Sequence, residues 1–236
     1  MLWGKVALAA VWGGLLALER RAFLQAMLSR PLVAATGMGL LLGDVTSGLY
    51  IGVLLELFHL GAASLGAAVS EHDTLAATGT SAAAAAIVLG DGGASTPAIW
   101  ALAILLFAGL GVVGRAVDRR LEFHTAHLAQ KAISRAEHGD LTGAVRLNLF
   151  GMWPHFVVFG AITGACAVAG FAIAPLFAAL PLAADRALAW TYPAMASVAA
   201  AVAARGSHAK HAALWAGMVG AVVAVVGELW LARVGI

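Results

Sequence analysis

The segment at residues 29–73, SRPLVAATGMGLLLGDVTSGLYIGVLLELFHLGAASLGAAVSEHD, decides how this chain folds. Most of it is apolar enough for the interior of a membrane, yet it carries ionisable side chains and repeated glycines. An isolated charge at the centre of a bilayer costs at least about 2.5–3.5 kcal/mol. Its acids therefore need charged partners or a water-filled cavity, and its glycines let helices and backbone approach closely.

The composition of the whole chain indicates a membrane protein. Of its 236 residues, 62% are hydrophobic and 11% are charged, and the mean hydropathy is +0.92. A soluble domain is about half apolar and about one quarter charged. We therefore predict an all-α polytopic membrane protein with discontinuous or re-entrant helices, forming a single membrane-embedded domain over residues 1–236 in the lipid bilayer.

Several function classes are disfavoured by what the sequence contains. The net charge is only +2 and no basic patch is interleaved with aromatic residues, so we expect no nucleic-acid partner. Cys166 is the single cysteine, and the eight histidines are scattered, which argues against a metal site. No nucleophile, phosphate-loop or metalloprotease motif is present, so we expect neither a cofactor nor a catalytic residue.

Hydrophobic runs predict where the chain crosses the membrane. A crossing helix needs roughly 20 apolar residues. Two runs, 31–43 and 61–70, are too short to cross alone, which is why we expect discontinuous or re-entrant helices. The first run also resembles a signal peptide, and we interpret it as a retained first span. The candidate spans are 1–18, 31–43, 45–60, 74–90, 98–114, 153–174, 188–204 and 212–232.

The polar stretch at residues 115–148 sets the predicted orientation. It holds six of the fourteen Lys and Arg residues, so we place it in the cytoplasm as an amphipathic helical insertion. Gly139 can end one helix there and Asp140 can cap the next. The loop at 90–97, which has no cation, then lies outside, and the basic loop at 205–211 lies inside.

Glu56 is the most informative of the acids, because VLLELFHL offers it neither a loop nor a helix terminus to cap. It is either a ligand for substrate or half of a structural pair with Arg30 or His59. Glu56 and His59 are three residues apart and share a helix face. Asp44 follows Gly43 and is either the N-cap of the next helix or a ligand.

The acidic cluster SEHD, at residues 70–73, has two interpretations as well. It is an ordinary polar loop in which Asp73 caps a helix that starts at Thr74, or Asp73 caps and binds together. Carboxylates that accept paired hydrogen bonds, placed beside helix breaks, suit a hydroxyl-rich polar substrate.

Three blocks of the sequence, taken in order, resemble a known family. FLQAMLSRPLVAATGMGLLLGD is followed by SGLYIGVLLELFHLG and then by LGAAVSEHD. Over residues 19–78 this order and spacing are similar to the IIC component of mannose/fructose/sorbose-type phosphotransferase (PTS) permeases. The chain departs from the family pattern at SEHD and at residues 19–21, where it carries additional charged residues.

The resemblance implies a multi-pass subunit of the bacterial inner membrane that binds and translocates a hexose-type sugar. It implies a hetero-oligomer with a IID membrane subunit, and phosphorylation of the sugar by soluble IIA and IIB proteins. The substrate-binding positions carried over are Gln25 and Arg30 in the 25–30 segment, Glu56, and Asp73 in the 66–73 segment. The residues expected to support them are Asp44, His59, Glu71 and His72.

Two other functions compete with the permease. A regulatory or scaffold membrane protein could keep the IIC fold without transport, although the retained intramembrane acids argue against it. An intramembrane enzyme is disfavoured by the missing catalytic motifs.

Overall fold

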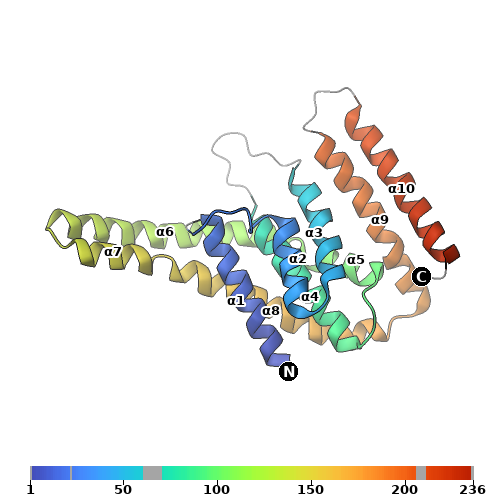
Figure 1. Cartoon of the computed structure of the whole chain (residues 1–236), viewed down its shortest axis with the longest axis horizontal. Helices are drawn as coiled ribbons and strands as arrows, with labels where there is room; N and C mark the ends of the chain where they lie inside the picture. The colour runs from blue at the N-terminus through green and yellow to red at the C-terminus, as the bar shows by residue number, and fades with distance from the viewer. Residues whose placement is uncertain (1, 22, 61–70, 206–210, 235–236) are drawn as a thin grey trace.

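The computed structural model describes residues 2–21, 23–60, 71–205 and 211–234, and within these ranges the chain forms ten α-helices and no strand. Most of the helices gather in one bundle, and two of them extend away from it as a long arm (Figure 1). This confirms the all-α prediction. Within the described residues, five helical stretches are long and apolar enough to cross a membrane, two of which each join two consecutive helices; this agrees with the prediction of a polytopic membrane protein.

The first three helices are α1 (Leu2–Arg21), α2 (Pro31–Leu42) and α3 (Val45–Leu60). α2 and α3 form a tight hairpin that turns at Gly43, whose φ of 89° lies in the left-handed region. Asp44 Oδ1 accepts the Ser47 N–H at 3.1 Å, which confirms the N-cap interpretation of Asp44. With 12 residues, α2 is only about 18 Å long. It is too short to cross alone, and its re-entrant placement stays a prediction.

Helix α4 (Asp73–Asp91) lies at the centre of the bundle and packs on α8 (Trp153–Ala178), α1, α2, α3, α5 and α6. Its alanines at 82–86 are fully buried. A Cβ built on Gly170 of α8 would lie 2.3 Å from the Ala83 carbonyl oxygen. Small side chains therefore let the backbones of α4 and α8 meet directly.

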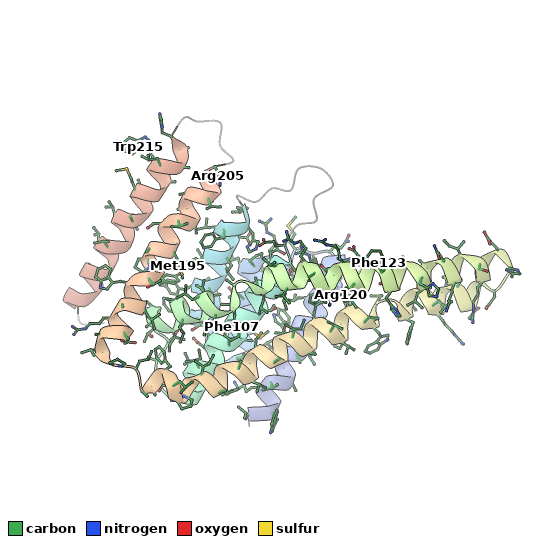
Figure 2. All side chains as sticks on the ribbon, turned by 180° about the vertical axis from the view of Figure 1, so that it is seen from behind. Phe107, Arg120, Phe123, Met195, Arg205 and Trp215 are labelled. Carbon is green, nitrogen blue, oxygen red and sulfur yellow. The ribbon has the colours of Figure 1, made fainter. Side chains whose placement is uncertain are left out.

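The predicted span at 98–114 is divided in the structure. Helix α5 (Pro97–Phe107) ends in the bundle, and α6 (Leu110–Glu137) begins after Gly109. α6 then leaves the bundle beside α7 (Leu141–Phe150); Figure 2 labels Phe107 on α5, and Arg120 and Phe123 on the outgoing part of α6. Asp140 Oδ1 accepts the Gly143 N–H at 2.8 Å, so the predicted helix stop and cap at residues 139–140 are confirmed.

Helices α9 (Leu182–Ala204) and α10 (Ala212–Val234) form a hairpin at the edge of the bundle (Figure 1). α9 begins six residues before the predicted span and packs on α5 and α3. Trp100 stacks on Tyr50 with ring centroids 4.2 Å apart, and the Tyr192 hydroxyl donates to the Tyr50 carbonyl at 2.9 Å. The Tyr192 ring also meets both of these rings edge-on, at centroid distances of 6.1 Å and 5.2 Å, so Tyr192 joins the hairpin to the bundle.

Candidate functional site

A polar cavity of about 240 Å³ opens where several helix ends meet. The end of α1, the 23–30 connection, the start of α2, the end of α3 and the start of α4 all contribute to it. The lining residues are Arg20, Ser29, Arg30, Pro31, Glu56, His59, Leu60 and Asp73. Three of the four predicted substrate-binding residues therefore face one cavity, although they are far apart in the sequence.

Glu56 is paired with Arg30 across the α2–α3 hairpin. Its Oε1 accepts from Arg30 Nε at 2.8 Å and also from Arg30 Nη2. Its Oε2 accepts the Leu32 N–H at 3.3 Å, in the first turn of α2. The prediction that Glu56 has no helix terminus to cap is therefore wrong, because it serves the terminus of the neighbouring helix. The structural pair with Arg30 exists, and the pair lines the cavity.

Arg20 forms the opposite wall, and the sequence interpretation missed it. Its guanidinium pairs with Asp73 and also donates to Thr74 Oγ1 at 3.2 Å and to the Glu71 carbonyl at 3.2 Å. The sequence signal for this role was the pair of consecutive arginines, Arg20 and Arg21, at the end of the first span. An arginine that close to membrane depth needs acidic partners as much as an acid needs cations.

The start of α4 differs from the prediction. His72 is the N-cap, and its Nδ1 accepts the Leu75 N–H at 3.0 Å, so the helix begins at Asp73 rather than at Thr74. His72 precedes the spanning helix, and burial, together with nearby Arg20, lowers the pKa of His72 to about 3. The imidazole is therefore neutral, as a capping acceptor must be. Asp73 is left to bind Arg20 at the edge of the cavity.

The 23–30 connection is held in place by buried groups of α1 and α4. Glu19, which is 3% exposed, accepts the Leu28 N–H at 3.2 Å and the Ser29 N–H at 2.9 Å. The Thr74 hydroxyl donates to the Ser29 carbonyl at 2.8 Å. Glu19 and Thr74 thus position the connection that carries Arg30, and neither was among the predicted residues.

Of the remaining predicted residues, His59 lines the cavity and the other four lie outside it. Gln25 is exposed, and its amide donates to the Arg21 carbonyl at 3.4 Å. Asp44 lies at the opposite end of the α2–α3 hairpin. Glu71 lines an adjoining cavity of about 430 Å³ that also contains His59. His72 is buried against Phe159, and residues 66–70 of the predicted 66–73 segment lie outside the described residues.

The polar side chains that line the cavity are hydrogen-bond donors and acceptors. Two guanidinium groups face two carboxylates, and the Ser29 hydroxyl and the His59 imidazole add further polar groups. Within the described ranges no three His, Cys, Asp or Glu residues gather closely enough to hold a metal ion. Arranged in this way, the groups can donate to and accept from the hydroxyls of a polar solute.

The fold and cavity define a class, the polytopic helical membrane proteins with a charged pocket at broken helix ends. The sequence model of the PTS sorbose-specific IIC component family matches residues 3–198. The chain belongs to this family of IIC components, as its motifs predicted.

Individual relatives agree with this membership. The mannose-specific EIIC component of Escherichia coli K12 is 38% identical over 113 residues, which are 48% of this chain and 39% of that protein. The alignment thus spans well under half of the relative. The sorbose-specific EIIC component of Lacticaseibacillus casei is 49% identical over 49 residues, covering 21% of this chain and 18% of that protein.

Two solved structures share the fold. One, described only as a membrane protein, aligns with a TM-score of 0.65 and 21% identity over 98% of this chain and 95% of its own. The other is the mannose transporter ManYZ in complex with microcin E492, with a TM-score of 0.58 and 19% identity over 99% of this chain and 96% of its own. At these identities the likeness establishes the architecture.

Proposed function

We propose that this chain is the sugar-translocating IIC subunit of a PTS permease and that the cavity at Arg30, Glu56 and Asp73 is its sugar site. The observation that carries the proposal is the pairing of two arginines with two carboxylates around one polar cavity at membrane-helix ends. A hexose offers adjacent hydroxyls, which suit such paired donors and acceptors. Hydrogen bonds to charged groups contribute about 1.5–3 kcal/mol each.

The proposal extends to the reaction partners. The subunit carries no phosphorylated residue; a separate IIB protein, charged by IIA, phosphorylates the hexose. A IID membrane subunit completes the permease as a hetero-oligomer in the bacterial inner membrane. Family membership supports this arrangement, and so does the ManYZ structure, which is named as a mannose transporter and shares the fold.

The decisive variant is Glu56→Gln, assayed for sugar binding by the purified complex. The amide keeps one acceptor for the Leu32 N–H but loses the negative charge. We expect sugar affinity to fall at least about tenfold, equivalent to about 1.4 kcal/mol. The Arg30 side chain is 45% exposed, so loss of the ion pair should cost folding no more than about 1 kcal/mol. The matched control is Glu137→Gln, which removes an exposed carboxylate at the end of α6.

A double variant separates ligand binding from structure. Arg30→Gln combined with Glu56→Gln removes both charges of the pair, so no unpaired charge remains. If this double variant assembles and still binds sugar as the wild type does, the carboxylate is not a ligand. Intact assembly without sugar binding supports the proposal. If Glu56→Gln alone fails to assemble and the double variant recovers both assembly and binding, the pair is structural.

A further inference from the structure

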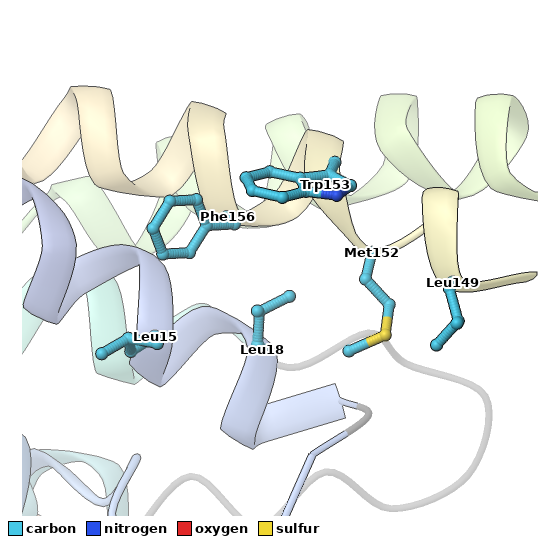
Figure 3. A pocket seen from close by; sticks show the side chains of 6 residues that line it. All are labelled: Leu15, Leu18, Leu149, Met152, Trp153 and Phe156. Atoms are coloured by element: carbon cyan, nitrogen blue, oxygen red, sulfur yellow. The ribbon is translucent and has the colours of Figure 1, made fainter. Parts of the chain in front are cut away.

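An apolar groove of about 350 Å³ runs along the outside of the bundle, away from the sugar cavity. In Figure 3, Leu15 and Leu18 of α1 lie on one side of it, facing Trp153 and Phe156 of α8. Leu15 and Trp153 are about half exposed, so the groove is open to its surroundings. In a membrane, those surroundings are the acyl chains of lipids.

A polar cavity of about 250 Å³ continues the groove, and the two share Leu18 and Met152. It lies one turn further along α1, towards the helix end at Arg21. Its polar lining residues are Arg21, Glu122, Thr125, Asn148 and His155. The combined site is thus apolar along the groove and has its charged and hydrogen-bonding side chains at the end near Arg21.

His155, at the polar end of the site, has a buried nitrogen without a hydrogen-bond partner among the described residues. The residue is only 6% exposed, and within the described residues its Nε2 has no hydrogen-bond partner. Buried polar atoms are nearly always hydrogen-bonded, so an atom of this kind lining a cavity indicates a group that occupies it.

The charges of the cavity indicate the chemistry of that group. Arg21 and Glu122 are the charged residues that line the cavity, and they pair at 2.9 Å; Arg21 also pairs, at 3.0 Å, with Asp118, which does not line it. A carboxylate retains acceptor capacity after one such bond. Glu122, which is about half exposed, can therefore accept from an ammonium group, while the Arg21 guanidinium can approach a phosphate.

We propose that this composite site binds one glycerophospholipid with an ethanolamine headgroup. The acyl chain lies in the groove of Leu15, Leu18 and Phe156, and the ammonium is held by Glu122 and His155. A phosphatidylglycerol has no ammonium group to donate to the Glu122 carboxylate. A phosphatidylcholine has the cation, but its quaternary nitrogen has no N–H to donate.

The test is native mass spectrometry of the chain purified with its membrane partners. The complex is titrated with palmitoyl-oleoyl phosphatidylethanolamine, phosphatidylglycerol or phosphatidylcholine. We expect the ethanolamine lipid to bind about tenfold more tightly than the other two. Glu122→Gln should remove that preference, and Glu137→Gln, beyond the cavity on the same helix, should keep it. Equal binding of the three lipids to the wild type, or an unchanged preference in Glu122→Gln, would overturn the proposal.

A photo-cross-linking residue at Leu18 identifies the occupant directly in native membranes. Leu18 lines both the groove and the polar cavity, so its adduct reports on either. An adduct with the mass of a phosphatidylethanolamine supports the proposal. An adduct with a second polypeptide, or with lipids of every headgroup in proportion to their abundance, contradicts it.

Discussion

Helices α4 and α9 are similar in hydropathy and opposite in environment. Both are long enough to span a membrane, with window hydropathies of 1.2 and 1.4. In an 18-residue apolar stretch of each helix, the chain itself buries 78% of α4 but only 11% of α9. Hydropathy therefore identifies both helices as membrane helices and does not tell which one is an inner helix.

Side-chain size explains the difference between the two helices. α4 presents alanine, glycine, serine and threonine on every side, so six neighbouring helices can approach it. α9 carries larger side chains, such as Trp190 and Val198, that the described residues leave about half exposed. An inner helix needs small residues for close packing, whereas an outer helix needs lipid or another protein.

Labelling of introduced cysteines gives the largest effect expected from this comparison, because it is all or none. Ala94→Cys, just beyond the end of α4, should react with a membrane-impermeant thiol reagent in intact cells. Ala132→Cys on the arm should react only after permeabilisation. The native Cys166 is buried and should stay unlabelled. Labelling at 132 in intact cells would reverse the predicted orientation. Labelling at neither position before permeabilisation would place both the 90–97 loop and the arm in the cytoplasm.

Purification in mild detergent tests what covers α9. The open face of the α9–α10 hairpin predicts a second membrane subunit, and a IID-like protein should co-purify in equal amount. Stronger detergent should release it and leave the α4 bundle folded, because that bundle is packed by its own chain. A stable monomer that binds sugar on its own would contradict this prediction.

Two glycine substitutions give the smallest effect and compare the packing of the two helices. A Cβ at Gly170 would lie 2.3 Å from the Ala83 carbonyl oxygen, so Gly170→Ala forces α8 away from α4. We expect a loss of about 1–3 kcal/mol in the free energy of unfolding. The nearest atom to a Cβ at Gly220, between α10 and α9, is Ser197 Cα at 3.3 Å, so Gly220→Ala should change stability by less than about 1 kcal/mol. Thermal unfolding in detergent measures both, and equal losses would show that α9 packs as tightly as α4.

Much of the fold could be predicted from the sequence. The caps at Asp44 and Asp140 and most of the hydrophobic runs are local signals, and the structure confirms them. The break at residues 108–109 was missed because LGVVG, which follows Gly109, is apolar like the span before it.

Less of the site could be predicted, because its partners come from distant parts of the chain. The sequence singled out the acids and overlooked Arg20, Glu19 and Thr74, whose roles depend on which helix ends meet. Glu56 has no cap in its own helix, and only the packing of α3 beside the start of α2 reveals the cap it makes there. Whether these residues bind sugar stays a prediction.

The equal numbers of arginines and carboxylates around the cavity have a consequence for directionality. An uncharged sugar enters such a cavity without disturbing its charge balance. A phosphorylated sugar adds roughly two negative charges near neutral pH. It would have to draw Arg20 or Arg30 away from a carboxylate, leaving that acid uncompensated. If the cavity is the sugar site, as proposed above, its charge balance favours the neutral sugar over its phosphorylated product.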